Sequence, residues 1–335
     1  MKIVFGSIYF AGIILLSGIN PLWTQTQVQA AILAQSFSSR EDADSLLNLG
    51  VQSRQEGNLE QAIAYWLQAL QIYHRLGDEE ALGLTYDYLG LTYISLNQYS
   101  QAETALRRRL AIARDRNDFQ GQIYGLNNLG ILLLEKANLP AAETLFQEAL
   151  VIARDIKHLA GIGLSLNNLG LISANQSQYP QAIAYYQEAL KLRQSASDLT
   201  GQASTLNNLG NAQQVVGQHG EALSSFRLAR VVAVEQQDLA NQFLAYQGIA
   251  LSYAAIDSYS LALQNLEAWL NLAIIEENSR QQFLSLRSYA RLHKQRKQQT
   301  EAENFYTRAI SLARQLGYTE QVALLNQELA ELIYN

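Results

Sequence analysis

The sequence predicts an all-α protein in which helix pairs stack in a row as a solenoid, and three observations support this prediction. Only three of the 335 residues are proline, and Ala, Leu, Gln and Glu dominate the segments between short turns of Gly, Asn and Asp, which is typical of helices. Hydrophobic residues make up 48% of the chain and charged residues 16%, so there is enough apolar surface to build a core. Finally, the sequence repeats itself at a spacing of forty residues, which is the signature of a solenoid.

Three columns of residues define the forty-residue repeat. A small residue follows a large apolar one in the first half of every repeat, an Ala always lies twelve residues later, and one large side chain lies four residues after that Ala. The small residues are Gly50, Gly90, Gly130, Gly170, Gly210, Ala250, Ala290 and Ala330; the second column is Ala62, Ala102, Ala142, Ala182, Ala222, Ala262 and Ala302; the third is Trp66, Leu106, Phe146, Tyr186, Phe226, Leu266 and Tyr306. The columns give about seven full repeats, over residues 41–317, and a C-terminal capping helix at 318–335.

Each repeat is predicted to fold into a first and a second helix joined by a short turn. In the third repeat, Leu126 and Leu129 have helical spacing, and Gly130 lies where only a small residue would let another helix approach closely. Pro140 and Pro180 mark the start of two second helices, because a missing N–H costs little in the first turn.

Polar side chains are expected to cap these helices. Short polar residues recur just before the first helices, where they can accept hydrogen bonds from free backbone N–H groups. Ser100 with Glu103, and Thr300 with Glu303, have the spacing of capping boxes at the start of second helices. The expected caps of the first helices are Asp78, Asp118, Asp198, Asp238 and Asn278.

The columns resemble the tetratricopeptide repeat (TPR) family, in which a small residue follows Leu, Ala opens the second helix, and an aromatic position comes four residues later. The resemblance covers residues 41–335, and the Asn-Leu-Gly sequence is similar to the 40-residue subtype found in many bacterial arrays. It implies a right-handed superhelix whose first helices line a concave groove. It also implies a protein or peptide partner for that groove.

Residues 1–34 differ from the repeats. Lys2 precedes an apolar run at 3–19, and small residues follow near the end of the segment, which is the order of a secretory signal peptide. Residues 35–40 would then be a linker. The alternative is an uncleaved membrane anchor formed by residues 3–19, because this run is nearly long enough to span a bilayer. In either case we expect the repeats to be exported, to the periplasm or the extracellular space.

Candidate binding residues come from the sequence Leu-Asn-Asn-Leu-Gly, which occurs at 126–130, 166–170 and 206–210. Because the two leucines are expected to be buried, the asparagine pairs should face away from the local core and form a ladder of amides across the repeats. An amide carries donors and an acceptor, so it could bind the backbone of an extended peptide. The candidate groove residues are Asn127, Asn128, Asn167, Asn168, Asn207 and Asn208, with Tyr124, Leu164 and Asn211 beside them.

Two alternatives concern the same surface. The asparagines could instead hydrogen-bond between adjacent first helices and hold the repeats together. Some TPR arrays bind a carboxylate with Lys and Arg around such an Asn, but here the column holds Leu47, Asp87, Asn127, Asn167, Asn207 and Gln247. A neutral groove that binds a peptide backbone is therefore predicted, and the basic runs at 107–109 and 291–297 are expected on solvated helix faces.

The composition argues against several other functions. A net charge of -6 opposes binding to nucleic acid, and the absence of cysteine excludes disulfides and thiolate metal sites. The four histidines are not paired at metal-ligand spacing, so we expect no catalytic site, no metal and no cofactor. The predicted function is a non-enzymatic scaffold that binds a peptide or protein segment; the alternative is an exported regulatory or sensory subunit of an enzyme or signalling complex.

Overall fold

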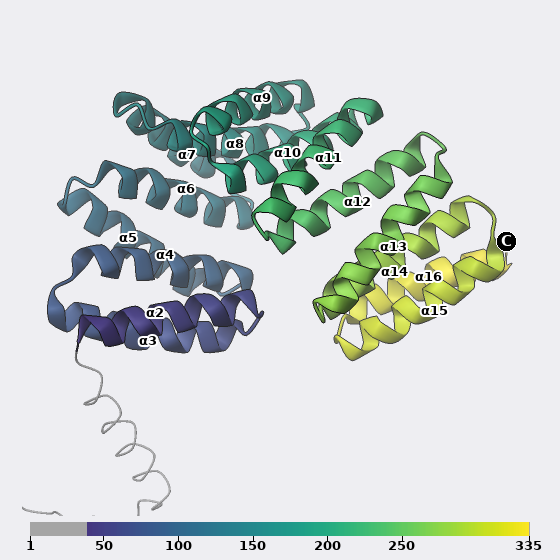
Figure 1. Ribbon diagram of the computed structural model, residues 1–335, viewed down its shortest axis with the longest axis horizontal. Helices are drawn as coiled ribbons and strands as arrows, with labels where there is room; N and C mark the ends of the chain where they lie inside the picture. The colour runs from purple at the N-terminus through teal and green to yellow at the C-terminus, as the bar shows by residue number, and fades with distance from the viewer. Residues whose placement is uncertain (1–38, 335) are drawn as a thin grey trace, which may run out of the picture. The chain divides into compact units, whose positions relative to one another are not determined.

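The computed structural model describes residues 39–334, which form fifteen α-helices and no strands (Figure 1). The even-numbered helices are the first helices of the repeats and the odd-numbered helices are the second. The first helices are α2 (Arg40–Gln55), α4 (Glu79–Ser95), α6 (Phe119–Glu135), α8 (Leu159–Asn175), α10 (Leu199–Val215), α12 (Leu239–Ala255), α14 (Ser279–Gln295) and α16 (Thr319–Tyr334). The second helices are α3 (Leu59–Leu76), α5 (Tyr99–Asp115), α7 (Leu139–Asp155), α9 (Tyr179–Ser195), α11 (His219–Glu235), α13 (Tyr259–Ile275) and α15 (Gln299–Gln315).

The predicted fold class, a solenoid of seven helix pairs followed by a C-terminal helix, is confirmed. The first helix begins at Arg40, one residue before the expected start of the repeats. The signal or anchor expected at 1–34 lies outside the described residues, as do residues 35–38 of the expected linker. Within residues 39–334, none of the helices combines the length and the apolar character that crossing a membrane requires.

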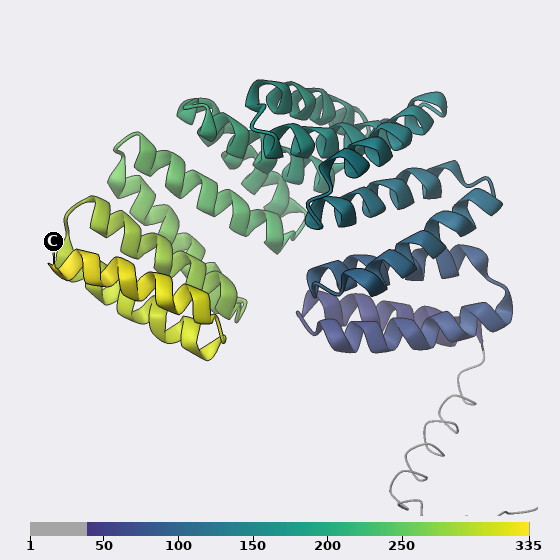
Figure 2. The same ribbon diagram turned by 180° about the vertical axis from the view of Figure 1, so that it is seen from behind.

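The chain forms two compact units, one ending at Thr92 and the other beginning at Tyr93. From α7 to α15, each second helix packs between the first helix of its own repeat and that of the next (Figure 2). The first helices α6, α8, α10, α12 and α14 also contact one another directly. They therefore form one continuous layer in the second unit.

Contact between the glycine column and the large side chains sets the distance between the two helices of a repeat. A Cβ atom placed on Gly170 would lie 2.5 Å from Tyr186 Cε1, and one on Gly210 would lie 2.8 Å from Phe226 Cε1. The same overlap occurs between Gly50 and Trp66 and between Gly130 and Phe146. All four large side chains are buried, so the close approach predicted for the glycines is confirmed.

The predicted caps of the first helices are confirmed. Asp118, for example, accepts a hydrogen bond from Gly121 N at 2.8 Å. From α4 to α14, the one first helix without an Asp or Asn at this position is α8, where His158 Nδ1 accepts a hydrogen bond from Gly161 N at 3.0 Å. The sequence did not predict this cap, because histidine is not among the residues that favour the position. The remaining caps are Asp78, Asp198, Asp238 and Asn278.

The two predicted capping boxes are wrong. Helix α5 begins at Tyr99 and its cap residue, Gln98, makes no side-chain hydrogen bond to the helix. Helix α15 begins in the same way, after Gln298. Each helix starts two residues earlier than the boxes require, so Ser100 and Thr300 lie inside the first turn. A capping box is instead present at the start of α2.

The turns between helices share one backbone conformation that has little signal in the sequence. Every twentieth residue from Gly57 to Gly317 has a positive φ, and in ten of these turns the residue is not glycine. In the turn after α6, Ala137 has a φ of 57°, and the N–H of Asn138 bonds to Leu133 O at 2.8 Å, as in a Schellman motif. A left-handed alanine costs roughly 1–2 kcal/mol, which the packing of the flanking helices offsets.

Replacing Gly170 by Leu tests the packing of the glycine column. The new side chain would overlap the buried ring of Tyr186, so we expect the free energy of unfolding to fall by roughly 1–3 kcal/mol or more. A matched control is Gly220→Leu in α11, where a Cβ atom meets nothing within 4 Å. Thermal melting followed by circular dichroism should show a lower midpoint for Gly170→Leu only, and equal shifts in both variants would contradict this packing.

Candidate functional site

The candidate asparagines join three neighbouring first helices through their side-chain amides. Asn168 Nδ2 on α8 donates to Asn127 Oδ1 on α6 at 2.8 Å. Asn208 Nδ2 on α10 donates to Asn167 Oδ1 on α8 at 3.1 Å. Within α8, Asn167 Nδ2 donates to Asn168 Oδ1 at 3.3 Å, so a single chain of amides runs from α6 to α10. We call this chain the amide ladder.

The expectation that both asparagines of each pair face away from the core is wrong. Asn127 is fully buried, and its Nδ2 also donates to Ile123 O at 2.8 Å and to Ser165 Oγ at 3.0 Å. Asn167, Asn168 and Asn207 are buried as well, whereas Asn128 and Asn208 are half-buried. The reason is that the next first helix covers this side of each helix. Hydrogen bonds between adjacent first helices, which were the alternative role expected for these asparagines, are therefore present. Ligand contact by these amides stays a prediction.

The ladder ends between α10 and α12. Elsewhere in the ladder, the second Asn of a pair donates to the first Asn of the preceding pair. Asn207 Oδ1 would therefore accept a hydrogen bond from residue 248, but this residue is glycine. A Cβ atom there would lie 2.5 Å from Phe226 Cδ1. Asn207 Oδ1 is consequently buried without a hydrogen-bond partner in the described part of the chain. Asn207 Nδ2 donates instead to Asn241 Oδ1 at 3.0 Å. The amide ladder therefore does not extend to α12.

Two rows of side chains flank the ladder at helical spacing and stay accessible to solvent. Tyr124 and Leu244 are 38% and 49% exposed, and Leu164 is half-buried. On the other side, Asn211 is exposed and Leu251 is 44% exposed. We call the two rows with the ladder the first-helix face. Its rows are Tyr124, Leu164, Ser204 and Leu244, and Ile131, Leu171, Asn211 and Leu251.

A buried arginine lies close to Tyr124. Arg193 on α9 occupies a position where most other repeats have Ala, and its Nη1 is 3.4 Å from Asp198 Oδ2. Room for it comes from Gly163, since a Cβ atom there would lie 2.7 Å from Arg193 Cγ. Burial lowers the pKa of Arg193, and the charge of Asp198 opposes this shift. Burial, together with Asp198, raises the pKa of Tyr124, so this hydroxyl remains a hydrogen-bond donor at neutral pH.

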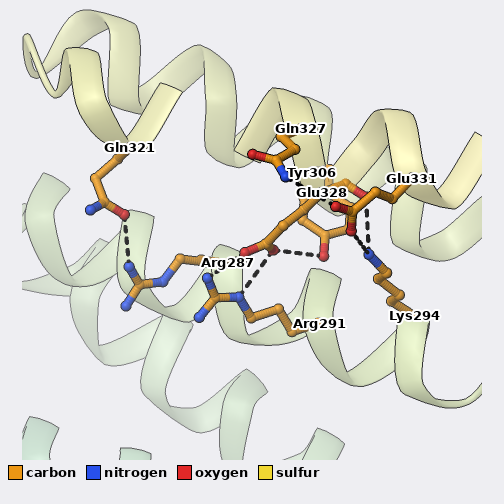
Figure 3. Close-up of polar contacts among 8 residues, drawn as sticks. All are labelled: Arg287, Arg291, Lys294, Tyr306, Gln321, Gln327, Glu328 and Glu331. Atoms are coloured by element: carbon orange, nitrogen blue, oxygen red, sulfur yellow. Dashed lines mark hydrogen bonds and ion pairs between the residues drawn. The ribbon is translucent and has the colours of Figure 1, made fainter. Parts of the chain in front are cut away.

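The second basic run does not lie on a free solvated face, as had been expected. Figure 3 shows Arg291 bonded to both carboxylate oxygens of Glu328 on α16, at 2.6 and 3.1 Å. Lys294 pairs with Glu331 at 3.2 Å, and His293 is buried. Burial raises the pKa of Glu328, but hydrogen bonds from Arg291 and Tyr306 outweigh burial and hold that pKa below its usual value. This run therefore attaches α16 to α14.

The first basic run is also only partly solvated. The Arg109 side chain is 12% exposed and its Nη2 lies 3.5 Å from Asp118 Oδ2, so it supports the cap of α6. Arg107 pairs with Glu103 at 2.8 Å on the exposed side of α5. The expectation of a solvated face is correct for Arg107 and wrong for Arg109.

One further residue belongs to the groove column and was not predicted. Arg287 lies forty residues after Gln247, one repeat beyond the residues named for this column. Its Nη1 donates to Gln321 Oε1 at 3.0 Å, and its guanidinium lies over the Phe283 ring (Figure 3 shows the contact with Gln321). The forty-residue period alone would have identified it. Nowhere in residues 39–334 do three or more His, Cys, Asp or Glu side chains gather where they could hold a metal ion.

Comparison with known families gives matches over more than half of the chain. Residues 41–115 and 161–231 match one family model, and residues 124–156 match another; both models are described as tetratricopeptide repeat. The 40-residue subtype is not distinguished by these matches and stays a prediction. No match was found among curated proteins.

Several solved structures are similar to this chain. A Rap protein complexed with competence and sporulation factor has 13% identity and a TM-score of 0.60, over 93% of this chain and 80% of that one. The Rap conjugation gene regulator of the plasmid pLS20, in complex with the Phr* peptide, has 18% identity and a TM-score of 0.60, over 83% and 75%. A signal transduction ATPase from Pyrococcus horikoshii with a tetratricopeptide repeat sensor has 16% identity and a TM-score of 0.58, over 90% of this chain but 47% of its own length. At these identities the similarity shows the fold alone.

The contribution of the ladder to stability can be measured with Asn168→Ala. This change leaves buried groups of Asn127 and Asn167 without their partner, so we expect unfolding to become easier by about 1–3 kcal/mol. The control is Asn175→Ala on the same helix, because Asn175 is exposed and bonds only within α8, to Leu171 O. Urea unfolding should shift for the first variant and change by less than about 0.5 kcal/mol for the second. If Asn168→Ala is as stable as the control, the ladder does not hold the helices together.

Proposed function

Because this chain belongs to the tetratricopeptide repeat family, we propose that it is a non-enzymatic scaffold that binds an extended peptide or protein segment on the first-helix face. The observation that supports the proposal most is the composition of that face. Exposed Tyr124 lies beside the amide ladder on α6, and exposed Leu244 and Leu251 continue the two flanking rows on α12, beyond the end of the ladder. Apolar contacts would supply affinity for the side chains of a segment, and amides would bind its backbone.

The hydrogen bonds within the ladder limit which amide atoms can bind a ligand. Asn208 is half-buried and uses Nδ2 to bond Asn167 Oδ1, so its own Oδ1 remains able to accept a hydrogen bond from the N–H of an incoming backbone. Asn127 and Asn167 are too buried to touch a ligand in this structure. We therefore assign backbone contact to the half-buried amides Asn128 and Asn208, with the buried ones fixing their orientation. Tyr124, Leu164 and Asn211 complete the proposed groove.

Charge supports a polypeptide as the partner. The two rows of the first-helix face contain no charged residue, and the whole chain carries -6, so nothing on this face favours a nucleic-acid backbone. We propose that the repeats act after export, on the basis of the signal-like order of residues 1–34, with a membrane contact only if that segment stays uncleaved.

A regulatory or sensory role is the second candidate. It is favoured by the similar structures, which include a conjugation gene regulator bound to a peptide and an ATPase with a repeat sensor. The two candidates share the same binding face and differ in what the bound segment controls. A single enzyme recovered as a stoichiometric partner from the native source would favour regulation, and several unrelated partners would favour a scaffold.

The binding face can be tested with matched leucine variants. Displayed random peptides are selected on the full chain, and their affinities are measured by fluorescence anisotropy for Leu244→Glu and Leu228→Glu. Leu244 lies on the first-helix face and is 49% exposed, whereas Leu228 lies on α11 and is 45% exposed. Loss of an apolar contact and burial of a charge should weaken binding about tenfold or more for Leu244→Glu only.

The control must keep its affinity within about twofold, because a leucine of similar exposure outside the proposed face should not contact the peptide. Binding that is lost in Leu228→Glu and retained in Leu244→Glu would place the site on the second helices and refute the proposal.

A further inference from the structure

A pocket of about 360 Å³ lies between the second helices α11 and α13. Helix α12 packs against both of them and contributes the buried side chain of Tyr253 to the pocket. Small-molecule sites in proteins begin at roughly 300 Å³, so this pocket has the size of a site for a small metabolite. It shares no residue with the first-helix face. Its other walls include Arg227 and Arg230 from α11, and Gln264, Asn265 and Ala268 from α13.

Arg230 interrupts an apolar column of the repeat. At the same position every other repeat has Leu or Ile, and three of these side chains are buried. An arginine at this position gives up the burial of an apolar side chain, so the packing of the repeat does not require it. The residues of this column in the other repeats are Leu70, Leu110, Leu150, Leu190, Leu270 and Ile310.

Ala268 leaves space on the wall that α13 contributes. In every other repeat the residue at this position has a longer side chain, whereas that of Ala268 ends at Cβ. Two departures from the repeat therefore coincide at one pocket, because Arg230 adds a positive charge where Ala268 removes bulk. The longer residues of this column are Gln68, Arg108, Glu148, Glu188, Leu228 and Arg308.

The two arginines carry charges that no carboxylate neutralises. Arg227 Nη2 donates a hydrogen bond to the Tyr253 hydroxyl, and the Arg227 guanidinium lies 5.4 Å from the centre of that ring. The Arg230 guanidinium lies 5.3 Å from the centre of the Tyr246 ring. Within residues 39–334 neither arginine pairs with an Asp or Glu, and no acidic residue lines the pocket. A cation–π contact leaves the charge in place, and like charges three residues apart on a helix repel each other.

Neutral polar groups lie beside the two cations. The Tyr253 oxygen accepts from Arg227, so the hydroxyl proton remains able to be donated to a ligand. Asn265 Nδ2 donates to Leu261 O at 2.8 Å, which leaves Asn265 Oδ1 as an acceptor. Gln264 adds an exposed amide with donors and an acceptor. The wall made by α13 can therefore bind hydroxyl groups.

We propose that this pocket binds the phosphate monoester of a small polyhydroxy molecule, such as a sugar phosphate. The guanidinium groups of Arg227 and Arg230 hold the dianionic phosphoryl group and remove their mutual repulsion. Tyr253 donates to a phosphoryl oxygen, and the amides of Gln264 and Asn265 bind the hydroxyl groups. A carboxylate fits less well, because it carries one charge where the pocket offers two. This site goes beyond the proposed function, which concerns the first helices.

The ligand class is tested with glucose 6-phosphate by isothermal titration calorimetry on the full chain. Glucose and glucuronate keep the sugar but replace the dianion with no charge or with a single one. Both should bind at least about tenfold more weakly than glucose 6-phosphate, because charge-assisted hydrogen bonds to the arginines are lost. No binding of glucose 6-phosphate at millimolar concentration, or equal affinity for glucuronate, would overturn the proposal. Equal affinity for inorganic phosphate would overturn the role given to the hydroxyl groups.

Arg230→Leu removes the charge and restores the residue that four other full repeats and the first repeat share. We expect this variant to fold and to bind glucose 6-phosphate about tenfold or more weakly. The control is Arg308→Leu on α15, an exposed arginine whose guanidinium lies 5.2 Å from the centre of the Phe305 ring. Its affinity should stay within about twofold of the unaltered chain. Equal loss in both variants would mean that total charge explains the effect, and the proposal would fail.

Ala268→Gln tests the location without changing the charge. It introduces the residue of the first repeat, Gln68, and should weaken binding of glucose 6-phosphate about tenfold or more by filling the pocket. Unchanged affinity in a variant that circular dichroism shows to be folded would place the ligand elsewhere and overturn the site. Selected peptides that depend on Leu244 should bind Arg230→Leu and Ala268→Gln normally. Failure of the phosphate site therefore leaves the proposed function in place.

Discussion

The arrangement of helices depends on a contact that leaves no room for a β-carbon. In four repeats a glycine of the first helix lies against a large buried side chain of the second, and Phe226 packs between two glycines, Gly210 on α10 and Gly248 on α12. This contact brings the two helices of a repeat close together and lets neighbouring first helices touch. Side chains between first helices are then close enough to exchange hydrogen bonds, as the amides of Asn127 and Asn168 do.

The same contact limits the ladder. Gly248 is needed for Phe226, and a glycine cannot provide the next amide, so Asn207 Oδ1 has no partner and the ladder stops. Packing therefore confines the amide ladder to α6, α8 and α10. In our account the ladder orients the surface on which a bound segment lies.

Features set by local chemistry could be predicted from the sequence. The repeat period, the glycine column and caps such as Asp118 depend on residue types at fixed spacing, and the structure confirms them. Burial of Asn127 could not be predicted from its own repeat, because the helix that covers it belongs to the next one. The left-handed turn at Ala137 is imposed by the packed helices on either side and has no local signal.

Hydrogen–deuterium exchange of the full chain, with and without a selected peptide, tests most directly whether partners bind the layer of first helices. We expect slower exchange on binding in α6, α8, α10 and α12, which carry the first-helix face. Exchange in the second helices α7 and α11 should not change. Protection confined to α11 and α13, with no change in α10 or α12, would show that the partner binds another surface and would contradict the account.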